Sequence, residues 1–163
     1  GIDNIPVAVN VSGHQLLQGD LAEYVSTTID QSGIPAKLLE LEITESVLID
    51  QAEHITASLD TLNTLGIKVA IDDFGTGNCS LSYFRDLPAD QIKVDLSFVK
   101  AMRTSKKDNA IVRGSIDLAH HCDMQVVAEG VEDEETACLA RSGKVQQRQH
   151  QHSSPRKAYY WAA

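Results

Sequence analysis

Five short apolar runs recur along this 163-residue chain and alternate with stretches of helical spacing. The runs are rich in β-branched residues and cover residues 6–11, 38–43, 67–72, 91–95 and 124–129. Their starts lie about 24 to 33 residues apart, which is the period of strands joined by crossover helices. The pattern therefore predicts an α/β fold with a parallel sheet.

Apolar residues at helical spacing predict the helices that connect these strands. One helix is expected over residues 50–65, where Gly66 follows as a C-cap, and another over residues 106–122. A third is expected to begin at Asp20 as its N-cap and to stop near residues 33–35. The predicted inner faces carry Leu21, Val25, Ile29, Ile55, Leu59, Leu62, Ile111, Val112, Ile116 and Ala119.

Side-chain alternation along the strands separates an open sheet from a barrel. Residues i and i+2 of a strand share a face, and the five runs sort into one apolar and one polar face. An open sheet covered by helices on both sides would be apolar on both faces, whereas a barrel can keep polar residues inside its mouth, so the barrel is favoured. The chain is short for a closed barrel of about 250 residues, so we expect an incomplete (β/α) TIM-like barrel with outer helices. The apolar face begins with Val7, Val9, Val11, Leu39, Leu41 and Ile43, and the polar face includes Glu40, Lys68, Asp95 and Gln125.

Five polar residues of this second face fall at the carboxyl ends of five different strands: Asn10, Glu42, Asp72, Lys93 and Glu129. Catalytic residues of barrels collect at that end. Any one strand-end acid taken alone is more often a helix cap or a solvated loop residue, but five at corresponding positions favour a site.

The oxygen donors of this set suit Mg²⁺ or Mn²⁺ rather than a soft metal. Asp73 directly follows Asp72, and two adjacent like charges are relieved by cations, so we expect a pair of ions and phosphate ester hydrolysis. Lys93 would supply a positive charge to the phosphate or to the attacking water. Two alternatives stay open for Lys93 alone: a core lysine paired with Asp95, and a Schiff-base lysine, which the surrounding carboxylates disfavour. Glu45 and Glu132 follow strand ends and could serve only as helix first-turn residues.

The composition limits partners and compartment. The chain has 14 Lys and Arg against 23 Asp and Glu, a net charge of −9, so a nucleic acid duplex is not an expected partner. The cysteines, Cys79, Cys122 and Cys138, are odd in number and form no CxxC pair, which indicates a reduced, cytoplasmic setting. No apolar run approaches about 20 residues, so this segment is expected to make no membrane contact, although a parent protein could be membrane-anchored.

Five stretches together resemble successive motifs of the EAL domain, the bacterial cyclic di-GMP phosphodiesterase family. They are VNVSGHQL (9–16), LEITES (41–46), AIDDFGTGNCSLSYF (70–84), DQIKVDLSFV (90–99) and VVAEGVE (126–132). The resemblance implies a modified TIM barrel that linearises cyclic di-GMP to pGpG with Mg²⁺ or Mn²⁺, two ions being expected.

The resemblance also implies a role for each matching residue. Asn10, Glu42 and Asp72 correspond to metal ligands, Asp73 to a contact of the second metal, and Lys93 to the residue that holds the catalytic water or phosphate. Glu129 corresponds to a metal ligand or to the base that activates water. Glu45 is expected to stabilise the loop after Asp73, which in this family also shapes a homodimer interface, and Glu132 to support the metal ligands.

The chain departs from the family pattern at both ends. No Glu-Ala-Leu tripeptide occurs in the sequence, and residues 143–163 read as a Gln-, His-, Arg- and Ser-rich tail without a clear strand. We therefore expect a partial EAL-type barrel domain over residues 1–142, a poorly ordered tail over 143–163, and impaired hydrolysis. The alternative is a non-catalytic module that binds cyclic di-GMP or dimerises for regulation.

Overall fold

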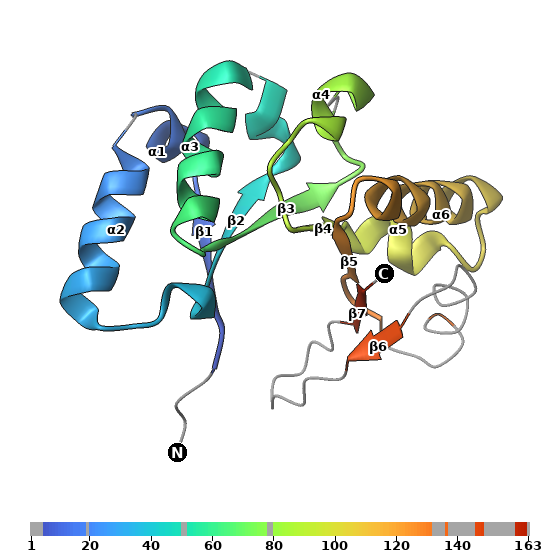
Figure 1. The fold of residues 1–163 in the computed structure, drawn as a ribbon. Coiled ribbons are helices and arrows are strands. Elements are labelled where there is room, and N and C mark those ends of the chain that lie inside the picture. Colours follow the sequence, from blue (N-terminus) through green and yellow to red (C-terminus); the bar gives the residue numbers. More distant parts are fainter. Residues whose placement is uncertain are drawn as a thin grey trace. The chain divides into compact units, whose positions relative to one another are not determined.

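A computed structural model describes residues 5–18, 20–49, 52–77, 80–131, 136, 146–148 and 159–162. The chain divides into two compact units, one comprising Gly1–Ile71 and Asn78–Ala89 and the other comprising Asp72–Gly77 and Asp90–Ala163. Each unit is built from strands followed by helices (Figure 1). The predicted α/β class is confirmed.

The first unit contains a parallel pair of strands and the helices that follow them. Strand β1 (Val7–Val11) pairs in parallel with β2 (Leu39–Thr44), and β3 (Lys68–Phe74) begins in this unit. Between the strands lie the helices α1 (Gly13–Leu17), α2 (Leu21–Ser32) and α3 (Ala52–Thr64), with 3-10 turns at Ala36–Leu38 and Glu45–Ile49; α4 (Leu81–Arg85) comes later in the chain. The predicted strands and helices of this region are thus present.

Helices α2 and α3 run side by side and bury apolar faces (Figure 1). Ile55, Leu59 and Leu62 of α3 are fully buried, as their spacing predicts. Gly33 and Gly66 end the two helical segments with φ of 69° and 82°, a left-handed conformation that glycine adopts without strain.

Two details of the first unit differ from the sequence-based expectation. Asp20 is the N-cap residue of α2, but its side chain makes no capping hydrogen bond. Val7 and Val9 were expected to face helices, yet they are 55% and 43% exposed. Strand β1 is an edge strand, because β2 is its neighbour in the order β1-β2-β3 of this unit.

The second unit contains the carboxyl end of β3, a parallel pair and two helices. Strand β4 (Gln91–Val94) pairs in parallel with β5 (Gln125–Ala128), so that Lys93 lies opposite Val127. Helix α5 (Leu96–Ala101) follows β4 directly and packs along α6 (Lys106–His121) (Figure 1). The core of this unit includes Ile92, Val94, Val99, Val112, Ile116, Val126 and Val127.

Two short strands lie in the tail where the sequence shows no clear strand. Strand β7 (Tyr159–Ala162) pairs antiparallel with β5, and β6 (Gln146–Arg148) pairs antiparallel with β7. Backbone pairing needs no hydrophobic alternation when the partner strand supplies the template, which is why a polar sequence gave no signal of β6. The rest of the tail lies outside the described residues, so its predicted poor order stays a prediction.

The buried face of α3 allows a test of the core. Leu59→Ala removes a fully buried side chain and is expected to lower the free energy of unfolding by about 2–5 kcal/mol through lost burial and a residual cavity. Leu65→Ala makes the same chemical change just after α3, at a side chain that is 37% exposed, and should cost less than about 1 kcal/mol. Urea titration followed by circular dichroism measures both, and equal losses would contradict the assigned core.

Candidate metal-dependent active site

The carboxyl ends of β3, β4 and β5 bring three predicted site residues together in the second unit. The Lys93 ammonium lies 3.1 Å from Asp72 Oδ1 and 3.0 Å from Glu129 Oε1. The two carboxylates therefore contact the same nitrogen from the two strands that flank β4, one on each side. Side chains of Lys93 and Asp72 are only 12% and 15% exposed, whereas that of Glu129 is 34% exposed. Charges so little hydrated need partners, and this ion-paired triad supplies them.

Asp73 follows Asp72 in an unusual backbone conformation. Its φ is 54°, in the left-handed region that few residues other than glycine adopt, and Asn and Asp are the commonest exceptions. The Asp73 amide donates to Asp72 Oδ1 at 3.0 Å, and Thr76 donates to the Asp73 carbonyl from its amide at 3.3 Å and its hydroxyl at 2.8 Å. The turn is therefore defined by hydrogen bonds, and backbone strain of this kind is concentrated at functional sites.

The electrostatic surroundings of Asp73 disfavour its ionised form. Burial is the largest cause of a raised pKa, and the negative charges of Asp72, Asp95 and Glu129 raise the pKa further. The nearby Lys93 ammonium acts in the opposite direction but does not cancel these effects. The cluster thus holds more negative charge than its own lysine neutralises.

Asp95 has a structural task at the start of α5. Its side chain accepts hydrogen bonds from the Ser97 amide at 2.9 Å and from the Ser97 hydroxyl, so it is the N-cap of that helix. Lys93 forms its ion pairs with Asp72 and Glu129, whereas the alternative considered for Lys93 was a pair with Asp95.

The remaining predicted residues belong to the first unit or lie outside the described ranges. Asn10 and Glu42 are register neighbours on β1 and β2, so their side chains leave the same face of that pair one strand spacing apart. Asn10 is exposed and Glu42 half-buried. Glu45 begins the 3-10 turn after β2 and is 4% exposed. Glu132 falls outside the described residues.

The donor chemistry of the second unit fits a hard divalent cation. The Asp72 and Glu129 carboxylates reach the same nitrogen, so their contacting oxygens lie no farther apart than about 6 Å. Asp73 adds a third carboxylate whose ionised form a cation would stabilise. Within the described ranges, no group of three or more His, Cys, Asp or Glu side chains is already arranged as a metal site.

Sequence reasoning missed the packing that surrounds these carboxylates. Gly75 and Gly130, which follow Asp73 and Glu129 closely, have φ of 100° and 66°. A Cβ at Gly75 would lie 3.0 Å from Phe98 Cε2, and a Cβ at Gly130 would overlap Leu96 Cδ1. Glycine allows the chain to adopt these positive φ values, but no pattern in the sequence indicates which side chains fill the space beside the two glycines.

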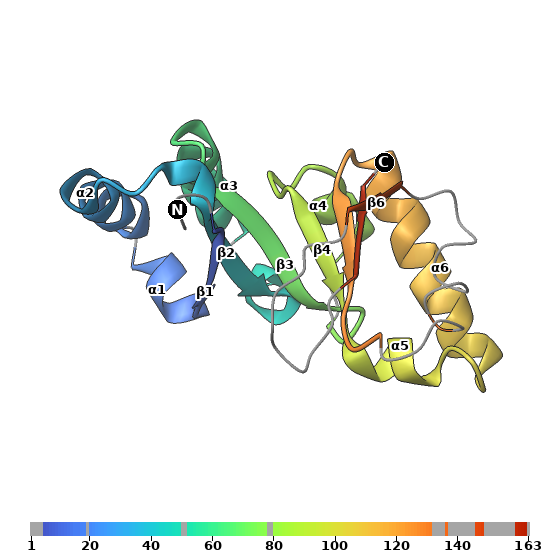
Figure 2. The same ribbon diagram turned by 90° about the horizontal axis from the view of Figure 1, so that it is seen from below.

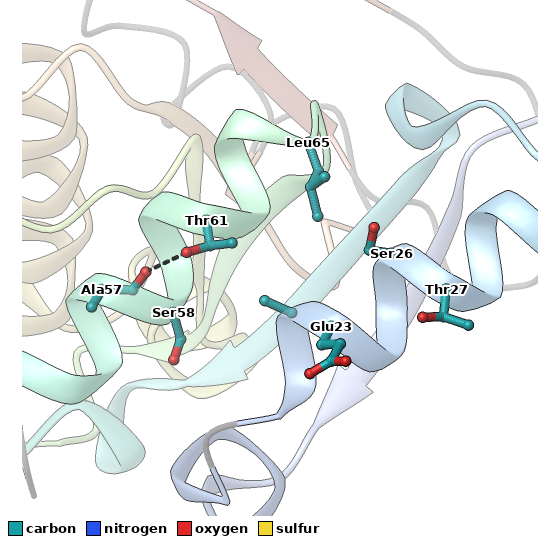
Figure 3. A pocket seen from close by; sticks show the side chains of 8 residues that line it. Glu23, Ser26, Thr27, Ala57, Ser58, Thr61 and Leu65 are labelled. Atoms are coloured by element: carbon teal, nitrogen blue, oxygen red, sulfur yellow. Dashed lines mark hydrogen bonds between the residues drawn. The ribbon is translucent and has the colours of Figure 1, made fainter.

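A groove between α2 and α3 in the first unit is a separate feature (Figure 3). It has a volume of about 580 Å³ and is lined by small and polar side chains, including Glu23, Ser26, Thr27, Ala57, Ser58 and Thr61. The Thr61 hydroxyl donates to the Ala57 carbonyl of its own helix at 2.9 Å. None of the predicted site residues lines this groove, so it does not bear on the candidate site.

Among the helices that the structure describes, none combines the length and the hydropathy that a membrane span requires.

Comparisons with known proteins give the site a family context. The cyclic di-GMP phosphodiesterase NbdA of Pseudomonas aeruginosa is 38% identical over 141 residues, which cover 86% of this chain and 18% of NbdA. The phosphodiesterase PaMucR in complex with c-di-GMP superimposes with a TM-score of 0.79 at 33% identity, over 84% of this chain and 56% of that one. A manganese and c-di-GMP complex of BlrP1 from Klebsiella pneumoniae gives a TM-score of 0.77 at 30% identity, over 86% of this chain and 36% of that one.

These three matches each cover between 84% and 86% of this chain. The chain spans between 16% and 21% of the length of the curated relatives that it matches. Its structural neighbours are EAL domains, which are TIM-like barrels, so the predicted incomplete barrel class is confirmed. The family model described as "EAL domain" matches residues 2–149, and the chain therefore belongs to the EAL domain family.

Proposed function

We propose that this protein hydrolyses cyclic di-GMP to the linear dinucleotide pGpG. The observation that carries the proposal is the contact of one ammonium, that of Lys93, with two carboxylates at the ends of three successive strands. The similar proteins NbdA and PaMucR support the substrate class, because each is named as a phosphodiesterase of, or in complex with, this dinucleotide.

The residues divide the chemistry between them. Hydrolysis adds one water across one P–O bond, so the site must remove a proton from water and stabilise charge on the phosphate oxygens. Glu129 is the most exposed member of the triad and can accept the proton from a water that reaches it from solvent. Lys93 lies between Glu129 and Asp72 and directs a fixed positive charge toward the phosphate.

Metal binding is the second part of the proposal. Asp72, Asp73 and Glu129 would hold Mg²⁺ or Mn²⁺ in the second unit, and Asn10 and Glu42 are the further oxygen donors that we assign to this role. Bound divalent ions, a pair by our assignment, would lower the pKa of water and polarise the phosphate. The manganese complex of the similar BlrP1 supports this choice of metal. Glu45 and Glu132 are proposed to support the loop and the ligands.

Two further parts of the proposal concern partners and compartment. We propose a homodimer contact through the loop after Asp73, on the resemblance of that loop to the family motif. We also propose a cytoplasmic location, which the odd number of cysteines without a CxxC pair supports.

Substitution of Glu129 tests the catalytic proposal. Glu129→Gln keeps the size of the side chain but removes its basicity, and it is expected to lower pGpG formation in MnCl₂ by about 10²–10⁴-fold. Glu23→Gln makes the same change on α2, away from the predicted residues, and should keep the wild-type rate. Chromatography of the nucleotides measures both. An unchanged rate in Glu129→Gln would refute the assignment, and tight binding of cyclic di-GMP by the wild type in both Ca²⁺ and Mn²⁺ without product would establish the binding-module alternative.

Substitution of Asp73 tests the electrostatic argument through stability. The pKa of Asp73 in the folded protein is raised above its ordinary value of 3.8, so the folded state binds this proton more tightly than the unfolded state. Stability is therefore lost as pH rises from 3.8 through the folded pKa, and it stays reduced at neutral pH. In EDTA, Asp73→Asn is expected to melt at a higher temperature than the wild type at about pH 7 but not at about pH 3.

Calorimetry at both pH values, with a matched control, decides this prediction. Asp60→Asn removes an exposed carboxylate from α3 and should leave the melting temperature unchanged. Adding MnCl₂ at neutral pH should raise the melting temperature of the wild type more than that of Asp73→Asn, because a ligand stabilises the state that binds it. A lower melting temperature for Asp73→Asn in EDTA at neutral pH would contradict the charge excess.

A further inference from the structure

Helix α5 begins at the point where the strand of Lys93 ends. The N-cap Asp95 and the residue before it, Val94, are bonded through the backbone to the neighbouring strands. The Asp95 amide donates to the Phe74 carbonyl at 3.4 Å, and the Val94 carbonyl accepts from the Glu129 amide at 3.3 Å. Figure 2 shows α5 directly after β4, beside the end of β5. The start of α5 is therefore linked both to the residue after Asp73 and to Glu129 itself.

The first residue of α5 packs on the turn that follows Glu129. Gly130 has a φ of 66°, and a Cβ added there would overlap Leu96 Cδ1, so the Leu96 side chain fills the space that any larger residue would need. Because a glycine has many accessible backbone conformations, a packed neighbour is what restricts it to one. Leu96 thereby restricts the backbone on the carboxyl side of Glu129.

The third residue of the same helix packs on the turn that follows Asp73. Gly75 has a φ of 100°, and a Cβ added there would lie 3.0 Å from Phe98 Cε2 and 3.7 Å from Ile111 Cγ2. The aromatic ring thus lies against the backbone two residues beyond Asp73. One turn of helix contacts both glycine turns, and both contacts lie within the second unit.

We propose that Leu96 and Phe98 are positioning residues that hold Glu129 and Asp73 in register with Lys93. Neither side chain is assigned a contact with substrate or metal. Catalytic groups must be held within about 0.5 Å of their productive geometry by the residues behind them, and α5 is the element that contacts both turns. The consequence for metal binding rests on the proposed function, whereas the restraint of the two turns does not.

Amide hydrogen exchange of the full chain in EDTA tests the restraint directly. Leu96→Ala is expected to raise exchange roughly tenfold at residues 129–131, and Phe98→Ala to raise it similarly at residues 73–77, because each frees a glycine turn. Leu96→Met and Phe98→Tyr keep most of the packing and should restore slow exchange. Val99→Ala is the matched control. Val99 is a fully buried residue of the same helix, but none of its atoms is among those nearest to Gly75 or Gly130.

Manganese titration followed by electron paramagnetic resonance tests the consequence for the site. Leu96→Ala and Phe98→Ala are expected to weaken Mn²⁺ binding by about 10- to 100-fold, as loss of supporting residues does at other metal sites, while Val99→Ala keeps the wild-type affinity. In pGpG formation, the two variants should lower kcat more than they change KM.

The outcomes separate this inference from the proposed function. If Leu96→Ala and Phe98→Ala change exchange at the two turns no more than Val99→Ala does, the positioning role is overturned whatever the protein binds. If exchange rises at the two turns, the wild type binds Mn²⁺ and the variants bind it with the same affinity, the role in the site is overturned. A wild type that binds no Mn²⁺ and forms no pGpG rejects the proposed function, and the exchange result still decides the restraint.

Discussion

The contact of Lys93 with Asp72 and Glu129 organises the second unit. It joins side chains of β3 and β4 and of the residue that follows β5 at distances of 3.0–3.1 Å, where little water reaches the lysine and the aspartate. Placing charges in such surroundings costs desolvation energy that the attraction repays only in good geometry, so an ion pair of this kind is weak evidence for stability. Its value lies in the position that it gives to each carboxylate.

The positions of these carboxylates depend on one feature that is local in the sequence and on another that joins distant segments. The alternation of side chains along each strand puts Asp72, Lys93 and Glu129 on one face, and this is a local property that the sequence reveals. The parallel register of β4 and β5 then sets Lys93 opposite Val127, two residues before Glu129. The five strands over residues 6–129 and the three long helices could therefore be predicted from periodicity, and the structure confirms them, while the roles of the site residues stay predictions.

Other features could not be predicted because they depend on packing between distant segments. Leu96 and Gly130 are 34 positions apart, and nothing local to either indicates that one fills the space beside the other. The positive φ of Asp73 was hidden for a related reason: an aspartate at a strand end commonly continues in an extended conformation, and the bonds from Thr76 decide otherwise. Alternation places Val7 and Val9 on the apolar face, but it cannot reveal that the two side chains stay 55% and 43% exposed on this edge strand.

The charge balance around Lys93 bears on whether the protein side chains alone could handle a phosphate diester. Asp72 and Glu129 contact the one ammonium of Lys93. The pKa of Asp73 is raised first by burial and then by the negative charges of Asp72, Asp95 and Glu129, which Lys93 offsets only in part. A phosphodiester is itself an anion, so it would be repelled by this group of carboxylates at neutral pH. Divalent cations would reverse the sign of the local field and stabilise both the carboxylates and the phosphate. The same carboxylate excess that destabilises Asp73 in the metal-free protein is thus what makes metal-dependent chemistry the physically consistent interpretation.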